Sequence, residues 1–130
     1  MVEKKLIQII YPELSYKIIG ILFDVYNNLG YGYQEKYYQE AVAIEFKKAK
    51  IYFREQVSLP INFKGDTIGR FFLDFLVEDK IVVEIKRYDK FHKADIQQVY
   101  AYLKHFNLKL GLLVSFTKEG VRFKRIINLN

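Results

Sequence analysis

The sequence contains no cysteine, no tryptophan, and only two prolines and seven glycines among its 130 residues. The missing cysteine excludes disulfides, thiolate metal sites and cysteine nucleophiles. The scarcity of proline and glycine, together with an apolar content of 51%, argues against a disordered, collagen-like or linker sequence. The length lies within the usual range of one domain, so we expect a single domain over residues 1–130.

Long hydrophobic runs are missing as well. Charged or polar residues interrupt the apolar stretches of the first twenty residues, MVEKKLIQIIYPELSYKIIG. No stretch approaches the roughly 18 uninterrupted apolar residues of a membrane span, and no secretory signal pattern precedes the first apolar segment. We therefore expect a cytoplasmic protein.

Positive charge is in excess, with 21 Lys and Arg residues against 15 Asp and Glu residues and a net charge of +6. Such an excess attracts polyanions, of which nucleic acid is the commonest. The chain also contains eleven tyrosines and eleven phenylalanines. We expect most of these rings in the core, although tyrosines interspersed with lysines can also stack on exposed bases.

Hydrophobic periodicity predicts two helices, three strands, a third helix and then one or two strands. The predicted helices cover residues 12–29, 34–50 and 93–106, and the predicted strands cover residues 51–63, 68–77, 81–86, 110–116 and 121–127. Pro60 places the first strand at a sheet edge or at a bulge. The almost wholly apolar segment 110–116 is typical of a central strand that is covered on both sides. The order indicates an α/β fold, with a mixed β-sheet flanked by α-helices.

Two carboxylates interrupt the most apolar strands, Asp74 in FFLDFLV and Glu84 in IVVEIK. A buried carboxylate without a partner costs several kcal/mol or changes its protonation state. Asp74 lies five residues before Asp79, and Glu84 lies five residues after it. If Asp79 is the centre of a simple hairpin, the two carboxylates face each other with Cβ atoms about 5 Å apart.

A divalent cation between these carboxylates would remove their mutual repulsion, and Mg²⁺ commonly takes one or two carboxylates together with water and substrate phosphate. The backbone carbonyl of Ile85 is a further candidate ligand. Lys86 projects from the same strand face as Glu84, where it could orient a metal-bound water or offset charge on a phosphate. The alternative is a hairpin edge with ordinary solvent-facing charges, and the spacing alone leaves both interpretations open.

Asp74 followed by Glu84-Ile85-Lys86 resembles the PD-(D/E)xK nuclease signature, with Leu73 in the position of its proline. Residues 32–38, GYQEKYY, resemble the motif that names the GxxExxY family, a branch of that superfamily. The resemblance covers nearly the whole chain. It includes residues 16–30, 54–57, 98–103, 112–116 and 124–127.

This resemblance implies a restriction-endonuclease-like core and a site that binds Mg²⁺ or Mn²⁺. Asp74 and Glu84 would be the principal metal ligands, and Lys86 the catalytic lysine. Glu35 would be the additional acidic residue that contacts the metal directly or through water. Gln98, on the third predicted helix, would match a polar residue often found near the site.

The loop after the third predicted strand supplies candidate phosphate contacts at Arg87, Lys90 and Lys93. The leading hypothesis is a metal-dependent nuclease that hydrolyses phosphodiester bonds, with DNA favoured over RNA and the choice between them left open. A homodimer would let two sites address two strands. The alternative hypothesis is a catalytically silent module of the same fold that binds nucleic acid or serves protein assembly.

Overall fold

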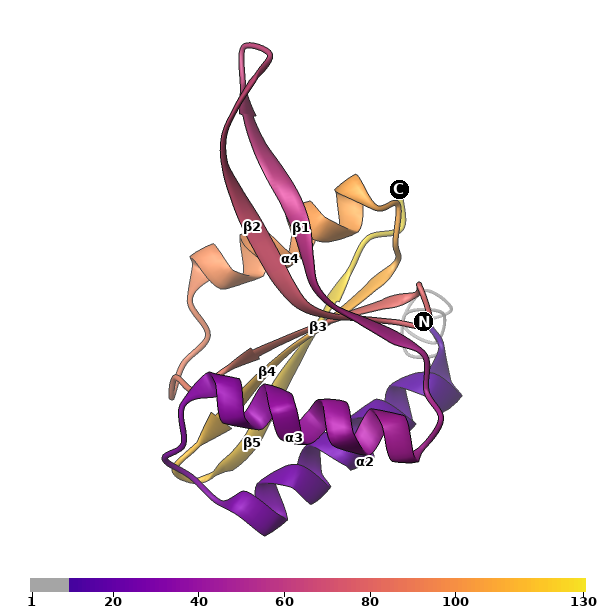
Figure 1. Ribbon diagram of the computed structural model, residues 1–130, viewed down its shortest axis with the longest axis vertical. Helices are drawn as coiled ribbons and strands as arrows, with labels where there is room; N and C mark the ends of the chain where they lie inside the picture. Colours follow the sequence, from indigo (N-terminus) through magenta and orange to yellow (C-terminus); the bar gives the residue numbers. More distant parts are fainter. Residues whose placement is uncertain (1–9) are drawn as a thin grey trace, which may run out of the picture.

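The structure is a computed structural model that describes residues 10–130, within which three helices and five strands follow one another in the predicted order (Figure 1). The elements are α2 (Pro12–Leu29), α3 (Glu35–Lys48), β1 (Phe53–Phe63), β2 (Asp66–Val77), β3 (Ile81–Lys86), α4 (Lys93–His105), β4 (Leu110–Thr117) and β5 (Gly120–Ile127).

The first helix, α2, follows local sequence rules at both ends. Pro12 occupies the first turn, where its missing N–H is not needed for a helical hydrogen bond. Ile18, Leu22 and Val25 recur on one face of the helix and are at most 3% exposed. The helix ends before Gly30, whose φ of 75° lies in the left-handed region that glycine adopts without steric cost.

The strands form one sheet in the order β1-β2-β3-β4-β5. Neighbouring strands are antiparallel except for β3 and β4, which are parallel because α4 carries the chain back between them. The predicted mixed sheet flanked by helices is confirmed, and the arrangement is that of a restriction-endonuclease-like fold.

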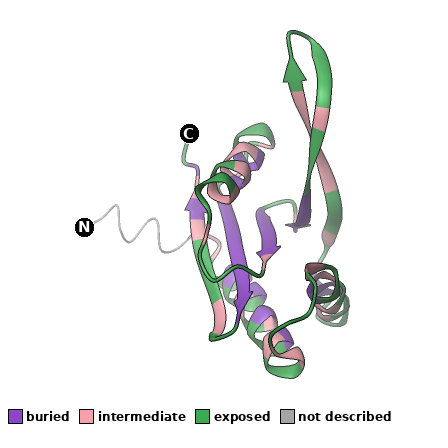
Figure 2. Cartoon of the chain, turned by 90° about the vertical axis from the view of Figure 1, so that its left-hand side faces the viewer, coloured by how far each residue is buried: buried purple, intermediate pink, exposed green. Residues whose placement is uncertain are grey.

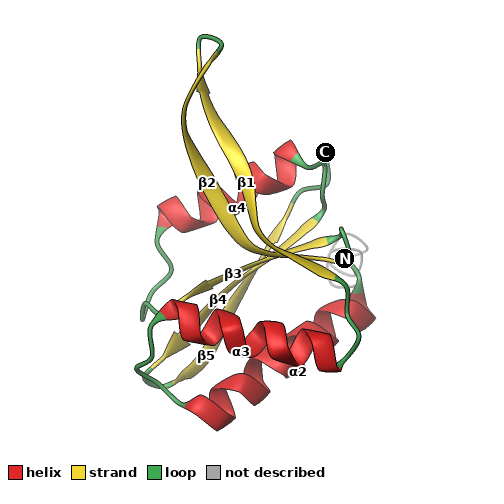
Figure 3. Ribbon diagram, viewed as in Figure 1, coloured by secondary structure: helices red, strands yellow, loops and turns green. Residues whose placement is uncertain are grey.

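Two hydrophobic clusters lie on opposite faces of the sheet. One joins α2 and α3 to residues such as Val83 and Ile85 of β3, and the other joins α4 to Val82. Figure 3 shows α2 and α3 lying together, with α4 well apart from them. Because side chains alternate along a strand, Glu84 and Lys86 share the α4 side with Val82.

The central strand β4 is buried along its whole length, as predicted (Figure 2). Gly111 lets α4 pack directly onto this strand, because a Cβ at that position would lie only 2.5 Å from Val99 Cγ1. This close packing fixes α4 against β4, the strand that lies parallel to β3.

The first two strands extend beyond the rest of the sheet as a two-stranded arm (Figures 1 and 2). They pair from Phe53↔Val77 to Phe63↔Asp66, with a register shift between Ile61 and Asn62, whereas β2 pairs with β3 only at Phe75, Leu76 and Val77. β1 is an edge strand, which explains how it accommodates Pro60. At Asp74 the chain of β2 is therefore leaving β3 for the arm.

The predicted boundaries were wrong mainly at the turns. β2 begins at Asp66 and β5 at Gly120, ahead of the predicted starts at residues 68 and 121, because these two hairpins need only two turn residues each. Lys64 and Gly65 both have positive φ, at 48° and 88°, as tight hairpin turns require. Ile51 lies before β1, where its N–H donates to the carbonyl of Phe46 at the end of α3.

Candidate active site

The site lies where β2 and β3 separate. The backbone ladder between them ends at Phe75↔Val83, and the same register places Asp74 opposite Glu84 at the next position. The hairpin register expected from the sequence is therefore correct. Asp74 is 7% exposed and Glu84 is 4% exposed, so both carboxylates are buried at the point of separation.

Beyond this point, hydrogen bonds from backbone N–H groups to the two carboxylates replace the backbone–backbone hydrogen bonds between β2 and β3. The Asp74 N–H donates to Glu84 Oε1 at 2.6 Å, and the Ile85 N–H donates to Asp74 Oδ2 at 2.8 Å. Each side chain thus binds the backbone of the opposite strand. These contacts hold the carboxylates together although both carry a potential negative charge.

Burial raises the pKa of both groups, because a carboxylate loses hydration in the protein interior. The pKa of Asp74 rises to about 6. The pKa of Glu84 rises to about 8, with burial as the largest cause and the negative charge of Asp74 as the next. The pair therefore retains a proton near neutral pH, and a cation beside it would relieve both the repulsion and the lost hydration.

The donor set around the pair fits a small, hard cation. Within residues 10–130, no group donates a hydrogen bond to Glu84 Oε2, and each bonded carboxylate oxygen retains a second lone pair. The N–H and C=O of a strand residue point to the same side, so the Ile85 carbonyl faces the gap that β2 has left. Carboxylate and carbonyl oxygens supplemented by water are typical ligands of Mg²⁺.

Glu35 lies near the pair at the start of α3. Its charge raises the pKa of Asp74 and Glu84, although it is a smaller cause than burial. Among the described residues, no three His, Cys, Asp or Glu side chains cluster closely enough to hold an ion on their own. Glu35 is thus a neighbour of the two carboxylates and not a third member of their cluster.

The loop that leads into Glu35 is anchored by Tyr38. The Tyr38 hydroxyl donates to the Gly30 carbonyl, and it accepts a hydrogen bond from the Tyr33 N–H at 3.4 Å. The Tyr38 ring is completely buried, with its centroid 4.4 Å from that of Phe116 on β4. This packing ties the segment between α2 and α3 to the sheet through Tyr38.

Lys86 is held on the α4 side of the pair. Its Nζ lies 3.8 Å from Asp95 Oδ1 in the first turn of α4. Burial lowers the pKa of Lys86, but the negative charges of Glu84 and Asp95, followed by those of Glu35 and Asp74, raise it above its usual value. Lys86 is therefore a permanent positive charge beside the carboxylates at neutral pH.

Asp95 was not identified from the sequence. Its Oδ2 is buried and has no hydrogen-bond partner in the described part of the chain. Gln98 of α4, which the resemblance placed near the site, donates at 3.0 Å to the hydroxyl of the buried Tyr102. The charges of Glu84 and Asp74 contribute to the raised pKa of Tyr102, after burial as the main cause. Gln98 is thus linked to the carboxylate pair through a tyrosine.

Two glutamines that sequence reasoning missed also reach the pair. Gln39 of α3 donates from Nε2 to Asp74 Oδ1 at 2.7 Å, and Gln56 of β1 donates from Nε2 to Gln39 Oε1 at 3.1 Å. Gln56 has a φ of 50°, an unusual conformation for a non-glycine residue within a strand. Left-handed residues of this kind cost on the order of 1–3 kcal/mol and gather at functional sites. The spacing of Gln39 four residues after Glu35 was the available signal, because it places both on one helix face.

A profile of the PD-(D/E)XK nuclease superfamily matches residues 12–126. The chain belongs to this superfamily. The crystal structure of SSO0001 is similar with a TM-score of 0.54 and 24% sequence identity, so this likeness concerns the fold. It covers 69% of the present chain and 48% of the SSO0001 chain. A search of curated proteins finds no significant match.

Nucleases of the PD-(D/E)XK superfamily typically use divalent metal ions, which agrees with the oxygen-rich carboxylate pair. The superfamily signature coincides with the separation point of β2 and β3, where Asp74, Glu84 and Lys86 come together. No helix in residues 10–130 is long and apolar enough to cross a membrane.

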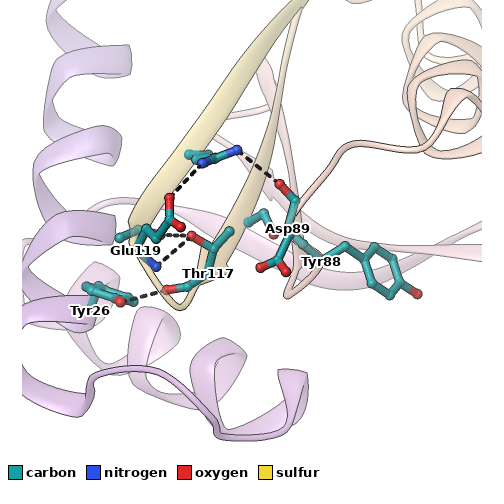
Figure 4. Close-up of polar contacts among 8 residues, drawn as sticks. Tyr26, Tyr88, Asp89, Thr117 and Glu119 are labelled. Atoms are coloured by element: carbon teal, nitrogen blue, oxygen red, sulfur yellow. Dashed lines mark hydrogen bonds and ion pairs between the residues drawn. The ribbon is translucent and has the colours of Figure 1, made fainter.

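The basic loop after β3 leaves directly from this PD-(D/E)XK site. Arg87 donates to the Tyr33 carbonyl at 3.0 Å and so ties the loop to the segment before Glu35. The Ser115 hydroxyl of β4 donates to the Tyr88 carbonyl. Arg122 of β5 donates at 3.1 Å to the carbonyl of Asp89, which is labelled in Figure 4.

These contacts fix the backbone of the loop and leave its outer charges in solvent. Lys90 and Lys93 are both exposed. Within the described residues, neither forms an ion pair that would compete with a phosphate. The loop therefore combines a held backbone with available positive charge.

Proposed function

We propose that this protein is a Mg²⁺-dependent nuclease that hydrolyses phosphodiester bonds, in DNA in preference to RNA. The observation that carries the proposal is the buried pair of Asp74 and Glu84 at the separation of β2 and β3, with Lys86 beside it. Mn²⁺ would also bind in such an oxygen-rich site, in place of Mg²⁺. The motif at residues 32–38 supports membership of the GxxExxY branch.

Asp74 and Glu84 would hold the ion together with the Ile85 carbonyl, because these oxygens face the same gap. Glu35 would act through a water molecule, since it lies near the pair without joining it. The bound ion would supply a more acidic water and would stabilise negative charge on the scissile phosphate.

Lys86 would orient the attacking water and offset charge on the phosphate. Its raised pKa favours this electrostatic role, because the side chain stays protonated at neutral pH. Gln98 would support the site through Tyr102, whose hydroxyl accepts its hydrogen bond.

Arg87, Lys90 and Lys93 would guide the substrate backbone to the carboxylate pair. The net charge of +6 strengthens this long-range attraction to nucleic acid. The enzyme would be cytoplasmic and would form a homodimer, so that two copies of the site address the two strands of a duplex.

Cleavage assays with the wild type, Glu84→Ala and Lys86→Ala test the proposal. End-labelled DNA and RNA, each single-stranded, duplex or branched, are incubated with Mg²⁺, Mn²⁺ or a chelator. The wild type should cut DNA only with metal, and each substitution should slow cleavage by roughly 100-fold or more. Glu40→Ala, which removes an exposed carboxylate from α3, is the matched control and should cut normally.

Cleavage by Glu84→Ala at the wild-type rate would overturn the catalytic assignment. Tight DNA binding with steep salt dependence but no cleavage and no response to Mg²⁺ would instead identify a silent binding module. Absence of any affinity for nucleic acid would favour a role in protein assembly.

A further inference from the structure

A chain of two glutamine amides runs from the base of the arm to the carboxylate pair. Gln56 of β1 donates to Gln39 Oε1 at 3.1 Å, and Gln39 of α3 donates to Asp74 Oδ1 at 2.7 Å. The three residues come from three different elements. Because Gln56 is nearest to solvent and Asp74 is buried, the chain leads inward to the carboxylate.

The direction of these hydrogen bonds follows from the chemistry of the amides. A carboxylate oxygen only accepts, so the group that Gln39 presents to Asp74 must be its NH₂. The carbonyl end of Gln39 then faces Gln56, where it accepts a hydrogen bond from the second NH₂ group. Gln56 therefore selects the amide orientation of Gln39 in which a donor meets Asp74.

Together with the Ile85 N–H, the Gln39 amide fixes both oxygens of Asp74. Oδ2 accepts from Ile85 and Oδ1 accepts from Gln39, so rotation of the carboxylate would break one bond or the other. The left-handed backbone of Gln56 lies opposite Asp74 in the β1–β2 register, between Glu55↔Phe75 and Val57↔Leu73. This irregularity brings the Gln56 side chain to Gln39 at the level of the site.

We propose that Gln39 and Gln56 are positioning residues that hold the Asp74 carboxylate in its ion-binding orientation. The inference rests on the proposed function, because it concerns the same carboxylate pair. Gln39 donates to Asp74 directly, and Gln56 acts mainly through Gln39, although Gln56 also lowers the pKa of Asp74 as a hydrogen-bonding side chain. Groups that orient metal ligands in this way typically change ion affinity by 10–100-fold when they are removed.

Isothermal titration of Mn²⁺ into the full chain provides a readout that does not depend on cleavage. The variants are Gln39→Leu, Gln56→Leu, the double variant and Asp74→Ala. Gln97→Leu is the matched control, because Gln97 is an exposed glutamine on α4. Gln39→Leu should weaken Mn²⁺ binding by about 10-fold, and Gln97→Leu should leave it unchanged.

The double variant separates a relay from two independent contacts. If Gln56 acts mainly through Gln39, Gln56→Leu should weaken binding by less than Gln39→Leu, and the double variant should bind nearly as Gln39→Leu does alone. Thermal unfolding of every variant identifies any loss of folding. Gln39→Asn, which shortens the same amide, replaces Gln39→Leu in the comparison if the leucine variant does not fold, and it should also weaken binding.

The result that overturns the inference is wild-type Mn²⁺ affinity in folded Gln39→Leu while Asp74→Ala has lost binding. Multiplicative effects of the two leucine substitutions would overturn the relay through Gln56. If neither the wild type nor Asp74→Ala binds Mn²⁺, the proposed metal site itself fails, and the positioning role fails with it.

Discussion

Asp74 and Glu84 are two neighbouring carboxylates, and burial disfavours the charged form of each. In the absence of metal, burial keeps the pKa of Glu84 at about 8 and that of Asp74 at about 6. The unfolded chain releases these protons at lower pH, near the ordinary pKa values of 4.5 and 3.8. At pH values between the unfolded-state and native-state pKa values, the native state binds more protons than the unfolded state. The metal-free protein therefore loses stability as pH rises through this range.

Glu84→Gln should therefore stabilise the metal-free protein at high pH. The neutral amide retains an oxygen acceptor for the Asp74 N–H and carries no charge into the interior. At pH 8.5 we expect a rise in the midpoint of thermal unfolding of roughly 5 °C, with little change at pH 5. Calorimetry at both pH values in the presence of a chelator measures the effect, and an equal shift at the two values would contradict it.

The pH dependence of ion binding follows from the same pKa values. A proton on Glu84 competes with a cation, so Mn²⁺ affinity of the wild type should increase by roughly 10-fold or more between pH 6 and pH 8. Titrations in buffers of different ionisation enthalpy should detect proton release on binding. Affinity that is constant over this range would contradict the assigned protonation.

Some site residues were predictable from the sequence and others were not, because the local sequence around them carries different amounts of information. Asp74 and Glu84 interrupt apolar strands, and the hairpin register alone brings them together. Gln39, Gln56 and Asp95 are polar residues of ordinary type on helices or strands. Their roles depend on contacts between elements distant in sequence, which no local pattern specifies.

At the scale of elements, α4 supports the site from the face of the sheet that carries Glu84 and Lys86. Asp95 in its first turn lies beside Lys86 and contributes to the raised pKa of that lysine. Asp95→Asn should lower the pKa of Lys86 and shift the alkaline limb of the pH–rate profile to lower pH. The profile should be measured with Mn²⁺ affinity as a second readout, and an unchanged alkaline limb would rule out this support.

Tyr38 holds the segment that joins α2 to α3 in place. Tyr38→Phe keeps the buried ring and removes the hydroxyl that donates to the Gly30 carbonyl. We expect a decrease of about 1–2 kcal/mol in the free energy of unfolding, measured by urea denaturation. Tyr37→Phe, at a ring that is 47% exposed, is the control. Equal stability of the two variants would show that the hydroxyl contact is not stabilising.

Element type and order were predictable because each segment has a clear period or turn signal. The parallel pairing of β3 and β4 follows from the intervening helix. The separation of β2 from β3 was not predictable, since apolar residues continue along β2 through Phe71 and Phe72 and give no local sign of it. Yet this separation opens the space in which the Ile85 carbonyl and both carboxylates lie.

At the scale of the whole molecule, net positive charge and the basic loop should govern substrate affinity. Lys90→Ala and Lys93→Ala should each weaken DNA binding and reduce the slope of log affinity against log salt by about 1. Lys17→Ala, at an exposed position on α2, is the control for the loss of one positive charge outside the loop. Fluorescence anisotropy over a salt series measures the slope, and identical slopes for all three variants would exclude a specific role for the loop.

The central claim is that Asp74 and Glu84 form a metal site in a nuclease. It is tested most directly by isothermal titration of Mn²⁺ into the wild type and Asp74→Ala, each with and without a short DNA duplex. We predict binding to the wild type, tighter with DNA present, and loss of binding in the variant. Equal binding by both proteins, or no binding by the wild type even with DNA, would contradict the claim.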